Sequence, residues 1–105
     1  MPEFILTYHG GTMPDTPEAG AEGMAKWKAW AAGLGAALTT PGAPVGKTSV
    51  LTADGVSGDP SPNPMMGFSI VEADDMDAAL ALLKDCPHLD YGGTLEVSPL
   101  VSMVD

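Results

Sequence analysis

Residues 67–89 constrain the fold more than any other stretch, because a strand, a helix and a helix stop follow one another there. Phe68 and Ile70 are residue types that favour a half-buried strand. Asp74 is expected to cap the helix that follows, since a carboxylate at this position accepts hydrogen bonds from backbone N–H groups of the first turn. Pro87 disfavours helical backbone at the preceding residue, so the helix is predicted to end by residue 85 or 86.

The helix predicted after Asp74 carries one apolar stripe at the i, i+3, i+4 and i+7 spacing. The members of this stripe are Met76, Ala79, Leu80 and Leu83. A helix with a single apolar stripe packs that side against a sheet or another helix. Residues 67–89 therefore predict a strand–helix unit that buries Leu80.

The N-terminal part of the chain predicts another strand and another helix. Residues 2–9 alternate between an apolar and a mixed side, which is typical of a strand. The apolar side consists of Phe4, Leu6 and Tyr8, and the mixed side of Ile5, Thr7 and His9. Thr16 followed by Pro17 marks a helix start, and this helix is expected to end near Gly33–Gly35 with Trp27 and Trp30 partly buried.

The middle of the chain is rich in proline and glycine. Residues 36–46 are expected to form a loop, and the weak alternation of residues 47–53 predicts the second strand, placed at a sheet edge because it is polar. Residues 56–66 contain three prolines at alternate positions, which excludes a regular ladder or a helix. This long irregular segment is expected to be flexible or to lie beside a ligand. Residues 94–99 predict the last strand.

The expected order is β-α-β-β-α-β in a single domain that spans residues 1–105. Short connections then favour a ferredoxin-like α+β fold, in which a four-stranded antiparallel sheet carries both helices on one face. Ile5 and Val71 are expected on the other face, where they would remain exposed to water. A second copy of the same sheet is the simplest cover, so we expect a homodimer.

Composition excludes several classes of function. Four lysines, no arginine and 14 acidic residues give a net charge of −10, which argues against nucleic acid and anionic membranes as partners. A single cysteine fits a reducing compartment, and the chain contains no apolar run of membrane-spanning length, so a cytoplasmic location is expected. No phosphate loop, dinucleotide fingerprint or zinc spacing is present, so no cofactor and no metal are predicted.

Several motifs together resemble YCII-related (DGPF-type) domains. The similar segments are residues 67–74, 78–80, 86–88 and 92–100. The resemblance implies a dimeric α+β barrel with a ferredoxin-like protomer, and most members have no established activity. Three departures stand out: Asp54-Gly55 is all that remains of the Asp-Gly-Pro-Phe signature, Ser98 replaces a common arginine, and no histidine lies near Met24. The family's proposed His–Asp dyad is therefore not carried over to this chain.

Three residues are candidates for catalysis. His9 ends the first strand and is expected to lie across the sheet from Glu96, and a histidine–carboxylate pair performs general acid–base work. His88 follows Cys86 and Pro87, an arrangement that suggests a thiol–imidazole pair, although the end of a helix disfavours a thiolate. The alternative for each histidine is a structural role, at a strand end for His9 and at a helix end or the surface for His88.

A ligand site is expected in the cleft between two sheets. Its candidate residues are Thr7, Ser69, Ser98 and Trp30. The tryptophan would stack a planar ligand, or it would belong to the core with Trp27. Three hypotheses follow: a dimeric domain that binds a small molecule or partner in the cleft, a small enzyme that uses His9 with Glu96 or His88, and a structural or regulatory dimerisation module.

Overall fold

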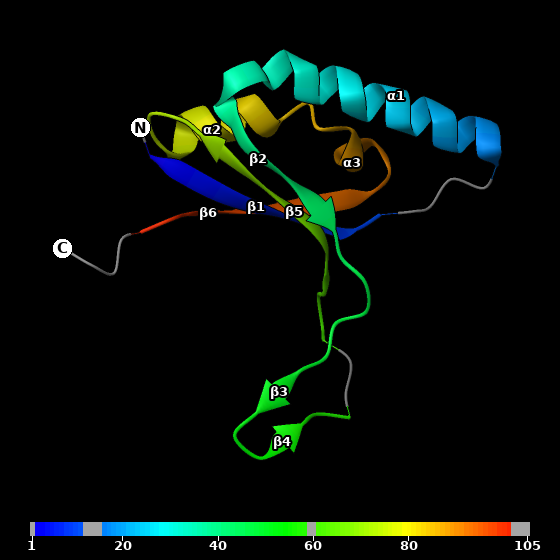
Figure 1. Ribbon diagram of the computed structural model, residues 1–105, viewed down its shortest axis with the longest axis vertical. Coiled ribbons are helices and arrows are strands. Elements are labelled where there is room, and N and C mark those ends of the chain that lie inside the picture. Colours follow the sequence, from blue (N-terminus) through cyan, green and yellow to red (C-terminus); the bar gives the residue numbers. More distant parts are fainter. Residues whose placement is uncertain (1, 12–15, 59–60, 102–105) are drawn as a thin grey trace.

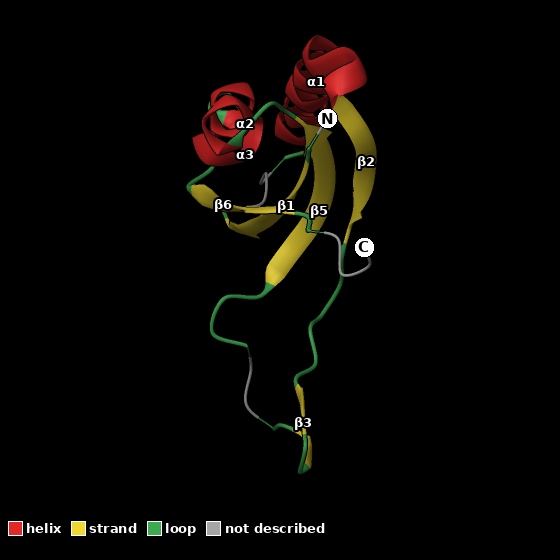
Figure 2. Ribbon diagram, turned by 90° about the vertical axis from the view of Figure 1, so that its left-hand side faces the viewer, coloured by secondary structure: helices red, strands yellow, loops and turns green. Residues whose placement is uncertain are grey.

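The computed structural model describes residues 2–11, 16–58 and 61–101. A four-stranded antiparallel sheet has the order β2-β5-β1-β6. Its strands are β1 (Glu3–Gly10), β2 (Leu38–Pro44), β5 (Met65–Glu72) and β6 (Gly93–Pro99). The helices α1 (Pro17–Leu34), α2 (Met76–Leu83) and α3 (Pro87–Asp90) all lie on one face of this sheet (Figures 1 and 2). This arrangement confirms the ferredoxin-like α+β fold.

The core lies between the sheet and the helices. The alternation predicted for β1 is confirmed, since Phe4, Leu6 and Tyr8 are buried under the helices. The other buried apolar residues are Val71, Ala73, Ala79, Leu83 and Cys86. The expectation that Val71 lies beside Ile5 on the other face is wrong, because Val71 pairs with Phe4 and shares its face. In the part of the chain that the structure describes, no helix is long and apolar enough to cross a membrane.

Helix α1 begins and ends where the sequence predicts. The Thr16 hydroxyl accepts a hydrogen bond from the Ala19 N–H group at 3.0 Å, and Pro17 occupies the first turn. Gly35 ends the helix with φ +55°, a conformation that glycine adopts without strain. The Trp27 ring lies edge-on to Tyr8 and tilted against Trp30, so this helix is held on the core mainly through aromatic contacts.

The second sheet strand is not where the sequence predicts it. Residues 38–44 form β2, although they were expected in a loop, and residues 47–53 contribute nothing to the large sheet. Pro41 and Pro44 are tolerated because β2 is an edge strand whose pairing with β5 is interrupted by two register shifts. At Gly42, φ is +77° and a Cβ would collide with the Phe68 carbonyl group, so this irregular strand depends on glycine.

Between β2 and β5 the chain leaves the body of the molecule. Residues 45–58 and 61–64, which we call the arm, extend away from the sheet on the side opposite to the helices (Figures 1 and 2). At its end, β3 (Leu51–Thr52) pairs with β4 (Gly55–Val56) in a two-stranded ribbon. The predicted irregular segment thus forms one limb of a projecting hairpin.

The strand–helix unit of residues 67–89 is confirmed with two corrections. Asp75 rather than Asp74 caps α2, its carboxylate accepting a hydrogen bond from Ala78 N–H at 2.8 Å. The helix starts one residue later than predicted because Ala73 is still extended and donates a hydrogen bond to the Pro2 carbonyl group. Leu80 is 48% exposed, so the stripe that faces the core is narrower than predicted.

Candidate functional site

The helix-free face of the sheet, which we call the open face, carries the candidate site. Ile5 lies opposite Ile70 and Thr7 opposite Phe68 in the pairing of β1 with β5, and all four side chains are half buried. In the pairing with β6, Thr7 lies opposite Glu96. The open face therefore combines an apolar strip with polar groups at its β6 side.

His9 lies where β1 and β5 lose their regular pairing. Tyr8 pairs with Gly67 and His9 with Met65, so Met66 is the extra residue of a bulge in β5. Bulges bend a strand and re-aim nearby side chains, and they are frequent beside functional sites. His9 is 5% exposed although it is polar. A buried imidazole needs partners for both ring nitrogens.

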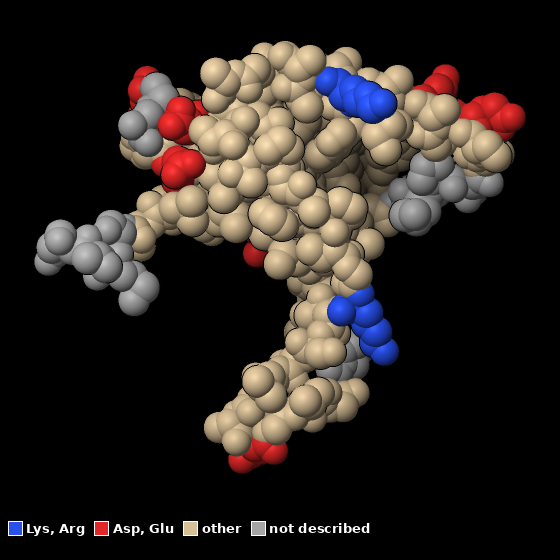
Figure 3. All heavy atoms as spheres, in the orientation of Figure 1, with Lys and Arg blue, Asp and Glu red and all other residues tan. Residues whose placement is uncertain are grey.

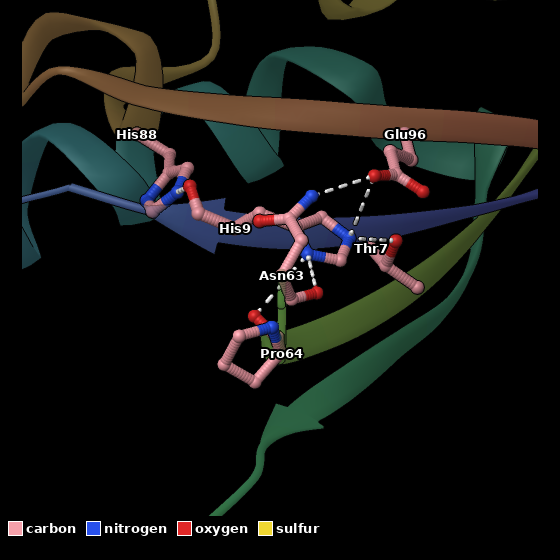
Figure 4. A network of polar contacts seen from close by, with 6 residues as sticks. All are labelled: Thr7, His9, Asn63, Pro64, His88 and Glu96. Carbon is pink, nitrogen blue, oxygen red and sulfur yellow. Dashed lines mark hydrogen bonds and ion pairs between the residues drawn. The ribbon is translucent and has the colours of Figure 1, made fainter. Parts of the chain in front are cut away.

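The Nδ1 atom of His9 faces two backbone carbonyl groups of the arm (Figure 4). It lies 3.0 Å from the Asn63 oxygen and 3.2 Å from the Pro64 oxygen. A carbonyl oxygen only accepts hydrogen bonds, so we infer that Nδ1 carries a proton. In the neutral ring, this places the lone pair on Nε2.

The Nε2 atom of His9 points toward Thr7 and Glu96. The Thr7 hydroxyl lies 2.6 Å from Nε2 and donates its proton when the ring is neutral. A Glu96 carboxylate oxygen lies 3.8 Å from the same nitrogen and becomes an ion-pair partner when the ring is protonated. The Asn63 side-chain amide donates a hydrogen bond to this oxygen at 2.9 Å, so the arm orients the carboxylate as well as the imidazole.

His88 does not reach the side chain of His9. Its Nε2 atom lies 2.8 Å from the His9 carbonyl oxygen, to which it donates a hydrogen bond. The His88 ring also lies edge-on to Tyr8, and a Cβ at Gly93 would collide with it. His88 thus fixes the backbone at the end of β1. Its predicted partner Cys86 is buried, and burial raises the pKa of this thiol to about 11.

The predicted ligand-binding residues fall on both faces of the sheet. Thr7 and Ser98 lie on the open face, where Ser98 is opposite Ile5 and exposed. Ser69 and Trp30 lie on the helix-covered side instead. Ser69 is buried, donates to the Pro41 carbonyl group at 2.7 Å and accepts from the Tyr8 hydroxyl at 2.8 Å, while Trp30 packs beside Trp27.

Sequence reasoning missed Asn63 and Pro64 as individual site residues. They belong to the proline-rich segment that was expected to be flexible or to lie beside a ligand. The sequence Pro62-Asn63-Pro64 gives a usable signal, because proline restrains the residue before it to extended backbone and Asn63 carries a side-chain amide that can donate hydrogen bonds. In the described part of the chain, no group of three His, Cys, Asp or Glu side chains is placed to hold a metal ion.

The fold and the site define a ferredoxin-like α+β domain with a buried histidine on its open face. No family model and no curated protein matches this chain. Among solved structures, the chain is similar to 5-chloro-2-hydroxyhydroquinone dehydrochlorinase from Burkholderia phenoliruptrix AC1100 in complex with 2,5-dihydroxybenzoquinone. The match has a TM-score of 0.51 and 17% identity, and it covers 90% of each chain. At this identity the likeness concerns the fold alone.

Proposed function

We propose that the protein is a small enzyme that transfers a proton on a small organic molecule bound at the open face, with His9 as the base. The observation that carries the proposal is the position of His9 Nδ1 between two carbonyl oxygens, which leaves Nε2 as the basic atom. A buried base whose tautomer is fixed by backbone groups is suited to general acid–base catalysis. The similar solved structure, an enzyme of the same fold, is compatible with this proposal.

The residues around His9 take distinct roles in such a step. Nε2 removes a proton from an O–H or C–H group of the substrate, which takes the place of the Thr7 hydroxyl at 2.6 Å. The imidazolium so formed donates to the arm carbonyl groups through Nδ1–H and faces the Glu96 carboxylate at 3.8 Å. The same nitrogen then returns the proton, so that the base is restored within one cycle.

The charge of the site indicates the kind of substrate. No lysine or arginine lies on the four strands of the large sheet, and Glu96 is the charged group beside His9. A strongly anionic molecule would therefore meet repulsion without a compensating cation. The half-buried side chains of Ile5, Phe68 and Ile70 suit a flat apolar body. We infer a neutral, largely apolar substrate with one acidic O–H or C–H group.

A homodimer is part of the same proposal. The apolar strip of the open face needs a cover, and a second sheet supplies one by the symmetry of an isologous contact. The motifs quoted for YCII-related domains and the ferredoxin-like fold both support placing the chain in that family, with a dimeric barrel as its assembly. The inter-subunit cleft would then enclose His9 and Glu96.

A binding domain without turnover is the second candidate. It is favoured by the low exposure of the His9 side chain, of which 7% is accessible in the single chain. In that case His9 would hold a ligand hydroxyl by a hydrogen bond from or to Nε2 and would move no proton.

Deuterium exchange separates the two candidates before the natural substrate is identified. Neutral enolisable ketones and phenols are incubated with the protein in D₂O, and binding is followed through the NMR signals of Thr7, His9 and Glu96. We expect exchange at an acidic C–H group to be accelerated, and His9→Gln to slow it about a hundredfold or more. The matched control Glu72→Gln, at the other end of β5, leaves it unchanged. Binding without His9-dependent exchange would contradict the enzyme and support the binding domain.

A further inference from the structure

The far end of the arm projects away from the body of the molecule (Figure 1). Its β3–β4 ribbon has strands of two residues each and stands apart from the sheet (Figure 1). Its hydrogen bonds include Ser57 N–H to the Val50 oxygen at 2.7 Å and the Thr52 hydroxyl to the Gly55 oxygen at 3.1 Å. An isolated two-stranded hairpin is at best marginally stable in water. An external contact would therefore stabilise this element.

The arm exposes large apolar side chains beside its polar ones. Leu51 and Val56 lie opposite each other in the β3–β4 pairing and are 76% and 73% exposed. Between the two limbs of the arm runs a groove of about 800 Å³. Apolar residues of its lining are Val45, Val50, Val56, Pro64, Met65 and Met66. Figure 3 shows few charged groups along the arm, with Lys and Arg in blue and Asp and Glu in red.

The whole chain exposes more surface than a compact monomer of its size. Its accessible surface is 7202 Å², against about 5,500 Å² expected for a folded monomer of 10.7 kDa. Its radius of gyration is 15.5 Å, against about 13 Å expected. The excess surface of about 1,700 Å² is in the range that each subunit of a large, obligate dimer buries. A second copy of the chain is therefore a partner of suitable size to cover this excess.

The direction of the arm fits a second copy as well. The arm leaves the sheet on its open side (Figure 2), where Ile5, Phe68 and Ile70 are half buried. When two open faces pack together around a two-fold axis, each arm runs alongside the other subunit. Leu51 and Val56 then lie against the partner, and the same patch serves both subunits, as an isologous contact requires.

The base of the arm holds the catalytic histidine. Asn63 and Pro64 supply both carbonyl oxygens at His9 Nδ1, and the Asn63 amide holds Glu96. These residues lie on the limb that returns from the β3–β4 ribbon to β5. Through Asn63 and Pro64, the arm therefore contacts the environment of His9 directly.

We propose that the arm binds a second copy of the chain and that this contact keeps Asn63 and Pro64 on His9, so that the site holds its arrangement in the dimer and loses it when the subunits separate. The inference rests on the proposed function for the role of His9. It adds a coupling between assembly and the site, because a free arm would leave His9 Nδ1 without fixed acceptors.

The test compares an arm variant with a matched control. Sedimentation and light scattering over a range of protein concentrations give the dimer dissociation constant for wild type, Leu51→Ser/Val56→Ser and Leu80→Ser. Leu80 is also an exposed leucine, but it lies on α2 on the helix side of the sheet. We expect the arm variant to weaken the dimer by about tenfold to a hundredfold. The control should dissociate as wild type does.

The His9 ring is read in the same samples by long-range ¹H–¹⁵N NMR. We expect the Nδ1–H form in the dimer, and exchange between the two tautomers in the arm variant at concentrations where it is monomeric. Circular dichroism confirms that the variant is folded. In wild type, exchange of the Ser57 N–H proton should slow as protein concentration rises, which tests the arm contact without any substitution.

Each outcome decides a separate claim. A wild-type monomer at all concentrations would overturn the inference together with the proposed dimer. A dimer equally strong in the arm variant would overturn the arm contact and leave the proposed dimer standing. A monomeric arm variant that keeps the fixed Nδ1–H form would overturn the coupling, while the proposal that His9 is a base would remain for the exchange experiment to decide.

Discussion

The two faces of strand β1 differ more than their alternating sequence suggests. Phe4, Leu6 and Tyr8 are buried under the helices, while Ile5 and Thr7 are half buried on the open face. The covered face obtains its burial from within the chain, and the open face does not. One strand thus contributes Phe4, Leu6 and Tyr8 to the core and leaves Ile5 and Thr7 partly exposed on the open face.

The polar groups of the two faces also differ in their hydrogen bonding. On the covered side, the Tyr8 hydroxyl donates to Ser69, which donates to the Pro41 carbonyl group. Both hydroxyl protons are therefore used in hydrogen bonds within the fold. On the open side, the lone pair of His9 Nε2 accepts a hydrogen bond from the Thr7 hydroxyl. The first network holds the fold together, while the second holds a basic atom in place.

Substitution on the covered face should have the largest effect on stability. Leu6→Ala removes a fully buried side chain and should lower the free energy of unfolding by about 2–5 kcal/mol. Ile5→Ala, its neighbour on the open face, should cost clearly less in dilute protein, where the open face is uncovered. Urea unfolding measures both variants. An equal loss of unfolding free energy for the two variants in dilute protein would contradict the difference in burial between the two faces.

The second largest effect is expected from alkaline pH, which should lower stability through the buried Tyr8 of the covered face. Burial raises the pKa of Tyr8 to about 12, with the hydrogen bond between Tyr8 and Ser69 opposing the shift and the charge of Cys86 adding to it. The folded state favours the neutral phenol. Its contribution to the free energy of unfolding is therefore present in full below pH 10.0, the ordinary pKa of tyrosine, and is lost as pH rises through about 12. Cys86 acts in the same direction through its raised pKa of about 11.

The variant Tyr8→Phe isolates this contribution. It should remove an alkaline loss of about 2 kcal/mol from the profile of unfolding free energy against pH. The measurement is urea unfolding at intervals from pH 8 upward. A profile that is identical for Tyr8→Phe and wild type would show that the phenol is not buried as the structure has it.

The smallest effect is expected at Leu80. Because this side chain is 48% exposed, Leu80→Ala should cost about 1 kcal/mol or less, in the range of surface positions. Leu83→Ala, three residues along the same helix, should cost about 2–5 kcal/mol because Leu83 is buried. Thermal unfolding of the pair checks which side of α2 packs on the covered face, and a larger cost at Leu80 would contradict the packing described here.

The sequence predicts the local elements and the fold class better than it predicts which face of the sheet each residue occupies. The alternation of β1, the Thr16–Pro17 helix start and the fold class are confirmed because they depend on local chemistry and hydrophobic period. The predicted position of the second strand was wrong because Pro41 and Gly42 are residue types that favour loops. The pairing of β2 with β5 shows that an edge strand accepts them.

The candidate site was predictable only in part. His9 and Glu96 were expected across the sheet from each other, and their side chains do approach at 3.8 Å. Asn63 and Pro64 contact His9 through backbone oxygens, which carry no residue signature, so sequence alone did not identify them. Ser69 and Trp30 were misplaced because their faces depend on strand register and helix orientation.

The most direct test of this account is the tautomer of the two histidines, read by long-range ¹H–¹⁵N NMR at a pH where both rings are neutral. The chain has only His9 and His88, so the two sets of signals are easily assigned. The account predicts opposite forms, with the proton on Nδ1 in His9 and on Nε2 in His88, because each faces backbone carbonyl oxygens through that nitrogen. A proton on Nε2 of His9 would contradict the claim that this atom is the base.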